Sequence, residues 1–525
     1  MKLFKAHGSL LLASLLLIAG VFAVYPYYQY LVDPDATAYL TIAKRYVAGD
    51  YARAINGYWS PWAIWLTALL IKCGYAAFTS AIMVNTIGAL CFLYISYSLF
   101  SLFKIVPGVR LLLSLTLVGF LVYAIFWQSF DDLWECFFLL AALRIMLKDD
   151  FTVRPSLWIA TGALGALAYF AKAYAFPFFI LNVLCCTYFI SRAKDKQEEN
   201  HWLKIAATTI LVMVVCSSPW IYVLYEKYGR ITTGTAGSLN MSWYLVGHPY
   251  WKEDIIHLLP PVYPDSPSYW EDPFIANGAA PQFYSSIRLF LLQGIRMVYN
   301  LLKLALSMNE LSMFFAFTVV VALAILLSKQ VKTLFAGRLS IVALSFLLFP
   351  LGYLLVNFQA RYLWYMLPLS MLIGALTIQK VTFHGRSERR LVKAIMLLFA
   401  ISFLVTPVLG LKDMYRKGQR EFEMAEWMKK AEIHGSFTTN IPYGSRSQDI
   451  VRLAYFSGNP YYNMPLPSPW KGILMEMRRY NIKYYFHYKD ADDVACQLID
   501  ESGQPFPEIT GGRLDGLSIY LVNPQ

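Results

Sequence analysis

Two carboxylates stand one residue apart directly after the first apolar segment of the chain. Asp33 and Asp35 flank Pro34, and Tyr39 follows Asp35 by about one helical turn. A carboxylate can orient a hydroxyl group or take its proton, so this pair could do acid–base chemistry. Pro34 restricts Asp33 to extended backbone, and Asp35 stands where a helix would take its N-cap. Because charge at membrane depth is costly, the local sequence leaves two interpretations open, a helix cap or a site residue.

A second acidic group lies between two later apolar segments. Asp131 and Asp132 are adjacent, and Glu135 follows Asp131 by one helical turn. Carboxylate oxygens are ligands that magnesium and manganese prefer, so Asp132 and Asp35 are the candidates for a divalent metal site. No ligand spacing assigns a metal or another cofactor with certainty. A solvated helix start explains Asp132 equally well.

Two isolated cations, Lys172 and Arg361, lie where apolar segments begin or end. Lys172 could simply extend its ammonium to the membrane interface, and Arg361, which precedes Tyr362, could mark a helix end. Alternatively, both cations could contact an anion. Glu310, after Asn309, precedes another apolar segment and is a weaker candidate for substrate binding.

The elements that must position these residues are membrane helices. Of the 525 residues, 58% are hydrophobic and 15% are charged, and the mean hydropathy is +0.46. In soluble proteins about a quarter of the residues are charged, so this composition predicts a polytopic membrane protein. The 45 Lys and Arg against 33 Asp and Glu give a net charge of +12. Because the basic residues gather in short loops between apolar segments, they indicate membrane orientation rather than nucleic-acid binding.

The seven cysteines lie mostly in or beside apolar segments, and no CxxC pair occurs. This distribution argues against a disulfide framework and against a zinc ribbon. Only Cys496 stands in a clearly soluble region, so small packing residues are the favoured interpretation.

The first apolar stretch, Ser9–Tyr28, follows a basic start and is long enough to span a bilayer. We interpret it as an uncleaved helix that enters from the cytoplasm, with signal-peptide cleavage after Ala23 as the alternative. Ten further spans are predicted, at Ile82–Phe103, Leu111–Trp127, Leu133–Leu147, Ser156–Ala171, Tyr174–Ile190, Ile205–Leu224, Leu311–Leu327, Ser340–Val356, Tyr362–Ile378 and Ala394–Leu411.

Basic residues set the orientation of these segments. Loops rich in Lys and Arg alternate with loops that hold the candidate site residues, which predicts eleven spans, a cytoplasmic N-terminus and an extracytoplasmic C-terminus. Trp62–Cys73 and Ile287–Leu306 do not fit this alternation, so both are expected as amphipathic helices in the outer interface. If both span, the total becomes thirteen and the termini keep their sides.

Two outer pieces are long enough to have structure of their own. The segment 226–285, rich in Pro, Tyr and Trp, is expected to form an ordered loop that covers a substrate. The tail combines an amphipathic helix at 421–435 with strand-like runs, which predicts a small α/β domain of structural or acceptor-recognising role. The strand-like runs lie at 436–440, 483–488 and 517–522. The expected domains are a transmembrane domain at 1–411, with outer loops 29–81 and 225–310, and the extracytoplasmic domain at 412–525.

The order of short motifs after the first helix resembles a known family. Asp-Pro-Asp-x-x-x-Tyr-Leu-x-Ile-Ala, Gly-Asp-Tyr and Tyr-Trp-Ser-Pro follow one another between residues 33 and 61. This order resembles the first outward-facing loop of the C-type (GT-C) membrane glycosyltransferases, the superfamily of the protein O-mannosyltransferases and the lipid A aminoarabinose transferases. The resemblance covers residues 1 to about 411. It implies an all-α polytopic membrane domain of about 11–13 transmembrane helices, beside the small α/β domain expected at the C-terminus.

The resemblance also implies roles for the acidic residues. Asp35 and Tyr39 match the family's Asp-x-x-x-Tyr pattern, whose carboxylate is the catalytic base or orients the acceptor. Many members carry a second acid directly after the first, whereas this chain has Ala36 there, so Asp33 could substitute for it. Asp131 and Asp132 resemble an acidic pair that positions substrates or, in some branches, a divalent metal.

For the cations, the resemblance implies contacts with a lipid phosphate. Lys172 stands in a setting similar to that of a phosphate-binding lysine in the aminoarabinose-transferase branch. Arg361 and Tyr362 resemble the start of a late core motif, and a guanidinium can bind phosphate oxygens through paired hydrogen bonds.

Together these roles give the hypothesis of a membrane glycosyltransferase. It would move a hexosyl or pentosyl group from a polyprenyl-phosphate donor to a hydroxyl of a lipid, glycan or protein acceptor, with inversion, at the outer face of the cytoplasmic membrane. The alternative is a transporter or lipid flippase, which would usually carry internal repeats and ionisable residues near the midplane. A third interpretation, a non-catalytic scaffold for envelope glycolipid assembly, would leave Asp35 replaceable by Asn.

Overall fold

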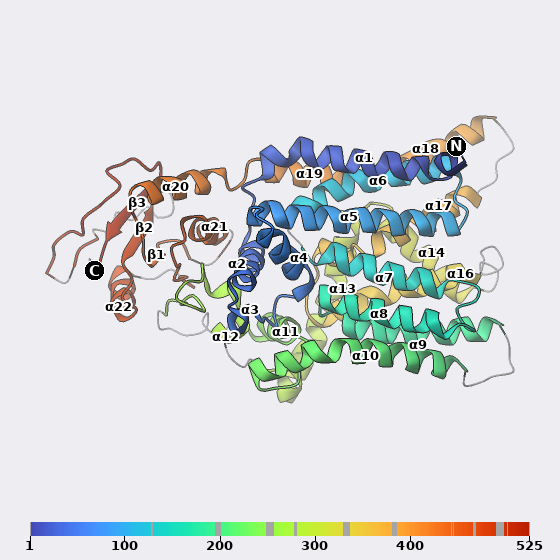
Figure 1. Ribbon diagram of the computed structural model, residues 1–525, viewed down its shortest axis with the longest axis horizontal. Helices are drawn as coiled ribbons and strands as arrows, with labels where there is room; N and C mark the ends of the chain where they lie inside the picture. The colour runs from blue at the N-terminus through green and yellow to red at the C-terminus, as the bar shows by residue number, and fades with distance from the viewer. Residues whose placement is uncertain are drawn as a thin grey trace.

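The computed structural model describes residues 2–127, 130–194, 201–247, 257–277, 281–328, 337–380, 386–442, 444, 446–465, 469–489, 498–500 and 502–523. Cys496 and residues 248–256 and 278–280 of the expected covering loop lie outside these ranges. The chain is 71% helical. Figure 1 shows a long helical bundle with the N-terminus at one end and a small sheet-containing domain beyond the other, which we call the domain-side end of the bundle.

A helix lies at each of the eleven segments predicted as spans, and these helices run side by side in Figure 1. Pro107 and Pro155 occupy the first positions of two of them, where the missing amide proton has no helical partner to lose. The helices are α1 (Lys2–Tyr28), α5 (Ala77–Leu102), α6 (Pro107–Phe126), α7 (Asp132–Met146), α8 (Pro155–Ala171), α9 (Ala175–Lys194), α10 (His201–Tyr228), α14 (Phe315–Leu327), α16 (Gly337–Leu348), α17 (Met366–Lys380), and α18 (Arg386–Ser402) followed by α19 (Val405–Met414).

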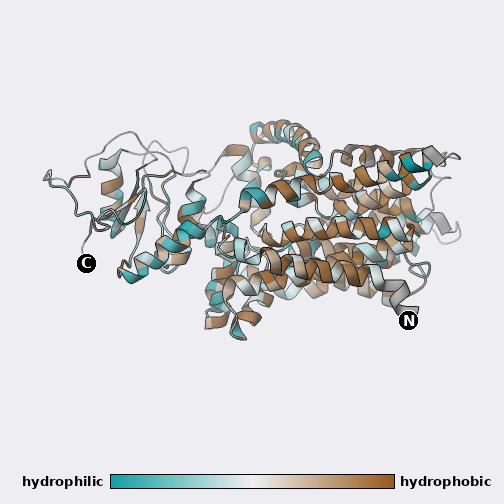
Figure 2. Cartoon of the chain, turned by 90° about the horizontal axis from the view of Figure 1, so that it is seen from above, coloured by the Kyte–Doolittle hydropathy of each residue, from teal (hydrophilic) through white to brown (hydrophobic). Residues whose placement is uncertain are grey.

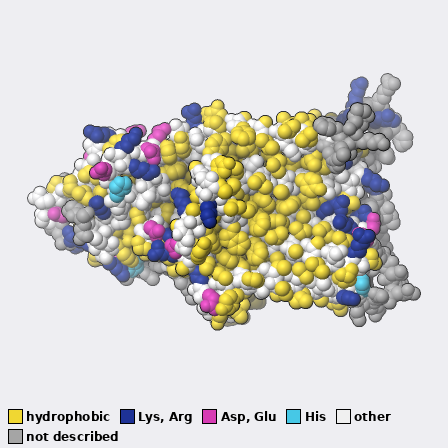
Figure 3. Space-filling model, in the orientation of Figure 1, with side chains coloured by type: hydrophobic (Ala, Val, Ile, Leu, Met, Phe, Trp, Pro, Cys, Tyr) yellow, Lys and Arg dark blue, Asp and Glu magenta, His cyan; other side chains and the backbone are white. Residues whose placement is uncertain are grey.

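The surface of the bundle is that of a membrane protein. Within the described ranges, seven helical stretches are long and apolar enough to cross a membrane, and several shorter apolar helices accompany them. Figure 3 shows a broad band of hydrophobic side chains over the bundle, with Lys and Arg gathered at the end away from the sheet. Figure 2 shows the same apolar character along the individual helices. The chain is therefore a multi-pass membrane protein.

Short helices fill the domain-side end of the bundle. Pro61 again begins a helix, α4, which packs against α2 and α5. The short helices are α2 (Pro34–Ala48), α3 (Tyr51–Ala54), α4 (Pro61–Lys72), α11 (Ala236–Val246), η2 (Tyr269–Glu271), α12 (Pro273–Asn277), η3 (Phe283–Ser285), η4 (Phe349–Leu355) and η5 (Ala360–Leu363).

Helix α13 (Ile287–Leu311) is one of the two segments expected in the interface. Its length and composition also include it among the seven candidate spans. Gln293, Asn300 and Lys303 donate hydrogen bonds of 2.7–3.2 Å to residues 354–357, at the end of η4 and directly after it. These bonds hold the polar face of α13 against the domain-side end, which fits the interfacial placement. The opposite face is apolar and exposed, at Phe290, Leu291, Ile295, Val298 and Leu302.

The three predicted strands are confirmed in the C-terminal domain. β1 (Phe437–Thr439) pairs in parallel with β2 (Tyr484–Tyr488), which pairs antiparallel with β3 (Leu517–Leu521). Alternate side chains of β2 face two cores: Phe486 stacks on Phe437 at 4.1 Å, and Tyr485 contacts Trp470 on the other side. Three helices accompany the sheet, α20 (Gln419–Lys430), which was predicted, and α21 (Ser447–Ser457) and α22 (Trp470–Arg479), which were not.

The C-terminal domain contacts the segment directly before Asp33. Arg452 of α21 is fully buried, and its Nε donates to the Val32 carbonyl at 2.6 Å. At Gly418, where φ is +89°, a Cβ atom would lie 2.0 Å from the Tyr30 carbonyl oxygen, so only glycine fits. Helix α19 continues just beyond the domain boundary predicted at 411 and ends at Met414.

Candidate functional site

Asp33 and Asp35 take different roles at the start of α2. The Asp33 carboxylate accepts a hydrogen bond from the Ala36 amide at 2.7 Å, so Asp33, rather than Asp35, is the helix cap. The Asp35 carboxylate accepts from the Trp270 indole at 3.0 Å and from the Arg361 guanidinium at 3.1 Å. Because Asp33 caps the helix, the Asp35 side chain is left to face Arg361.

The surroundings of Asp33 raise its pKa above the ordinary value. Burial, together with the nearby Asp35 charge, raises the pKa of Asp33 to about 7. The Ala36 amide and the Arg361 and Arg452 guanidiniums oppose this shift without cancelling it. Asp33 therefore titrates near neutral pH, directly beside Asp35.

Asp131 and Asp132, at the start of α7, have different partners. The Tyr39 hydroxyl donates to Asp131, while Lys172 pairs with Asp132 and, at 3.7 Å, with Glu135. Burial and the Asp132 charge raise the pKa of Asp131 to about 8. Burial lowers the pKa of Lys172, but its two carboxylate partners outweigh burial and raise it. Lys172 is therefore a charged lysine whose charge is already balanced.

Stacked tyrosines join the two ion pairs. The Lys172 ammonium lies 4.6 Å from the centre of the Tyr362 ring, which stacks on Tyr353 at 4.8 Å. Because Tyr362 directly follows Arg361, the pair of Arg361 and the pair of Lys172 are neighbours. The structure thus brings together most of the predicted site, namely Asp33, Asp35, Tyr39, Asp131, Asp132, Lys172, Arg361 and Tyr362.

Glu310 is the predicted site residue that the structure does not bring into this cluster. It is exposed near the end of α13, and its backbone carbonyl accepts a hydrogen bond from Thr406 in α19. Its assignment to substrate binding stays a prediction that no contact with the cluster supports in the described part of the chain.

The two carboxylates nominated for a divalent metal do not fit that role. Asp35 pairs with Arg361 and Asp132 pairs with Lys172, so each already faces a cation. Among the residues that the structure describes, no three or more His, Cys, Asp or Glu side chains are grouped to hold a metal ion.

Several residues of this region were not predicted from the sequence. Trp270, which bonds to Asp35, lies in the loop expected to cover a substrate, but nothing distinguished it among 14 tryptophans. Arg296 and Lys303 continue the polar face of α13 at helical spacing, a signal that the sequence did contain. Arg296 lies over the Tyr244 ring at 4.9 Å, and no carboxylate within the described ranges is in ion-pair distance of either cation.

Comparison with known proteins gives a structural relationship. No protein-family model matches the chain, and no curated protein matches it. The chain matches the crystal structure of ArnT from Cupriavidus metallidurans bound to undecaprenyl phosphate, with a TM-score of 0.56, 10% identity, and coverage of 99% of this chain and 100% of ArnT. The apo structure of the same ArnT gives a TM-score of 0.53 at 10% identity, covering 97% and 99%. The chain therefore has the GT-C fold predicted for it, including the C-terminal domain.

Proposed function

We propose that this chain transfers a sugar from a polyprenyl-phosphate carrier to an acceptor hydroxyl at the outer face of the cytoplasmic membrane. The observation that carries the proposal is the pairing of Asp35 with Arg361 at the domain-side end of the bundle, on the fold of ArnT. A carboxylate and a guanidinium side by side can serve the two ends of such a transfer. One end needs a base for the acceptor, and the other needs a cation for the departing phosphate.

The transfer can be written with its atoms balanced. Asp35 accepts the proton of the acceptor hydroxyl while the oxygen of that hydroxyl attacks the anomeric carbon. The bond between that carbon and the phosphate oxygen breaks, and the phosphate leaves with the electron pair. Attack from the face opposite the phosphate inverts the anomeric centre. Arg361 stabilises the charge that develops on the departing phosphate.

The sequence suggested that Lys172 binds the carrier phosphate together with Arg361, and we propose other cations for that role. Lys172 is balanced by Asp132 and Glu135, so it has little charge to offer a phosphate and instead holds α7 to the end of α8. Among the described residues, no carboxylate lies at ion-pair distance from Arg296 or Lys303, and Tyr244 neighbours both Arg361 and Arg296. We assign the carrier phosphate to the space between Arg361 and this face of α13.

The orientation belongs to the same proposal. Basic side chains gather at the end of the bundle that holds the N-terminus (Figure 3), which is the distribution expected of a cytoplasmic face. The C-terminal domain would then be extracytoplasmic. A reporter active only outside the cytoplasm, fused after residue 523, should be active, whereas the same reporter fused after Lys148 should not.

Mass spectrometry of envelope lipids and glycans tests the proposed reaction. A deletion strain should lose one hexose- or pentose-sized increment that wild type restores. Asp35→Asn should lower the transfer rate by roughly 10²–10⁴-fold, the usual contribution of a general base, at unchanged protein level. The matched control is Asp149→Asn, a highly exposed acid at the other end of the bundle. Full restoration by Asp35→Asn would contradict the assignment of the base and favour a transporter or scaffold.

A further inference from the structure

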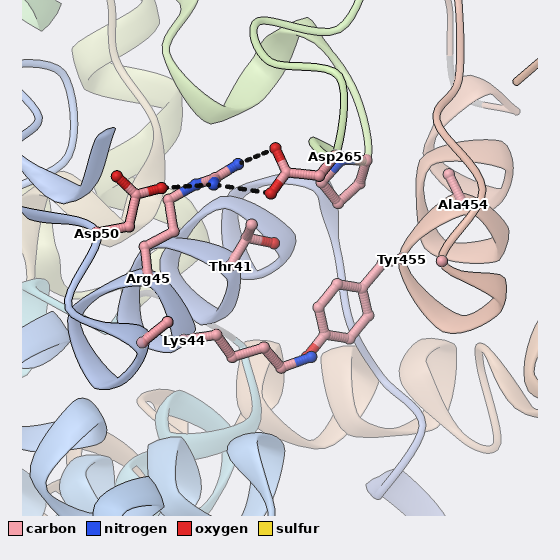
Figure 4. A pocket seen from close by; sticks show the side chains of 10 residues that line it. Thr41, Lys44, Arg45, Asp50, Asp265, Ala454 and Tyr455 are labelled. Atoms are coloured by element: carbon pink, nitrogen blue, oxygen red, sulfur yellow. Dashed lines mark hydrogen bonds and ion pairs between the residues drawn. The ribbon is translucent and has the colours of Figure 1, made fainter. Parts of the chain in front are cut away.

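A cavity of about 300 Å³ lies between the membrane bundle and the C-terminal domain, away from Asp35. Three segments distant in sequence line it: α2, the loop around Asp265, and α21 (Figure 4). Its volume is at the lower end of the range of small-molecule sites in proteins. Ala48, Pro267, Ala454 and Gly458 contribute apolar surface to it, and Thr41, Lys44, Arg45, Asp50 and Asp265 contribute polar groups. The polar groups offer partners for a polar ligand.

The two cations of this cavity differ in their partners. Arg45 is balanced, because it pairs with Asp265 at 3.0 Å, with Asp50 at 3.4 Å, and with the buried Glu271. Lys44 is not: within the described ranges no carboxylate is in ion-pair distance of its ammonium, which lies 4.5 Å from the centre of the Tyr455 ring. Figure 4 shows the Lys44 side chain reaching toward this ring.

The surroundings of Lys44 would favour an anion beside it. Burial lowers the pKa of Lys44, and the Lys429 ammonium lowers it further. An anionic ligand would relieve both effects, since it would pair with an ammonium that now has only an aromatic face and another cation nearby.

The cavity and the candidate site share one helix. Thr41, Lys44, Arg45 and Ala48 line the cavity and follow the 3- and 4-residue spacing of a single helix face. Asp35 and Tyr39 precede them in α2 and face Arg361 and Asp131. At 1.5 Å per residue, Thr41 lies about 9 Å along the helix axis from Asp35, roughly the length of two linked sugars.

We propose that this cavity binds an anionic sugar of the acceptor, an inference that rests on the proposed glycosyl transfer. The Lys44 ammonium pairs with the phosphate or carboxylate of that sugar, and the Tyr455 ring packs against its C–H face. The Thr41 hydroxyl bonds to a sugar hydroxyl. Because α2 and α21 both contribute, the acceptor is held by both domains at once.

Binding to the purified full-length chain in detergent tests the cavity without any transfer reaction. The probes are glucose 6-phosphate, glucuronate and uncharged glucose, measured by saturation-transfer NMR and titration. The wild type should bind a charged sugar more tightly than glucose by roughly tenfold, as one charge-assisted bond to Lys44 provides. Stronger binding of glucose 6-phosphate would identify a phosphorylated sugar, and stronger binding of glucuronate a sugar acid.

Lys44→Gln should abolish the preference for the charged sugar while keeping the unfolding temperature of the wild type. The matched control is Lys148→Gln, a lysine at the other end of the bundle, which should keep the preference. Equal binding of the three probes by the wild type, or an undiminished preference in Lys44→Gln, would overturn the proposal.

Asp35→Asn separates this proposal from the proposed function. It should bind the charged probe as the wild type does, because Asp35 does not line the cavity. If the deletion strain loses no sugar increment, the glycosyl transfer fails whatever the probes do. If the increment is lost but Lys44→Gln binds and transfers normally, the cavity proposal alone fails.

Discussion

The two ion pairs of the candidate site differ in what surrounds their carboxylates. The Asp35 side chain is 20% exposed and has one cation, Arg361. The Asp132 and Glu135 side chains are only 5% and 2% exposed and share one cation, Lys172. A buried pair loses heavily when one partner is removed, whereas a partly open carboxylate can reach a substrate. We infer that the Asp35 pair does chemistry and that the Lys172 cluster holds the bundle together.

The largest effect on stability is expected from Lys172→Met. It would leave two buried carboxylates without their cation, and such losses cost about 3–5 kcal/mol. Chemical unfolding of the purified protein should show this decrease, with Lys148→Met as the control. If Lys172→Met is as stable as the wild type but loses transfer, the structural role of Lys172 is contradicted and Lys172 contacts the substrate instead.

Asp33→Asn should change the pH dependence of stability. The pKa of Asp33 rises from an ordinary 3.8 in the unfolded chain to about 7 in the folded one, so the folded state holds the extra proton between these values. Stability from this group is present at low pH and falls as pH rises from about 4 to about 7. Asn keeps the helix cap but removes the titration. The unfolding temperatures of wild type and variant should therefore diverge over this pH range. Parallel curves would contradict the raised pKa of Asp33.

A smaller effect is expected from Tyr362→Leu, which removes the ring beneath the Lys172 ammonium. Cation–ring contacts contribute about 0.5–2 kcal/mol, so the variant should be less stable by that amount. Tyr362→Phe keeps the ring and should retain most of the stability. Equal losses in both variants would mean that the hydroxyl, not the ring, matters.

The smallest effect is expected from Glu310→Gln. Glu310 is exposed and belongs to neither ion pair, and such substitutions change free energies by about 0.5 kcal/mol or less, roughly twofold in rate. A loss of transfer beyond tenfold would bring Glu310 back into the site.

Much of the fold could be predicted because its signals are local. Apolar runs of membrane length and the basic loops between them predicted a helix at all eleven positions where the structure has one. Short β-rich runs likewise predicted β1, β2 and β3. Helices α21 and α22 were missed because they are short and lie in a polar tail dominated by turns.

The pairing of charges could not be predicted, because it depends on contacts between distant residues. Asp35 and Arg361 are 326 positions apart, and Asp132 and Lys172 are 40 apart. The sequence therefore nominated Lys172 as a free cation for a phosphate, since its two acidic partners belong to another helix. It also placed the cap of α2 at Asp35, whereas Asp33 is the cap, because either side chain suits a helix start.

The bond from Arg452 to the Val32 carbonyl has a consequence for biogenesis. The two residues are 420 positions apart, so the turn at Asp33 is synthesised long before Arg452. At about 5–20 residues per second, this delay is roughly 20–80 s. During that interval the nascent bundle holds both acids of the turn without the guanidinium that fixes it. A truncated chain that ends after α19 would lack Arg452, so the bond that fixes the turn at Asp33 depends on the last fifth of the chain.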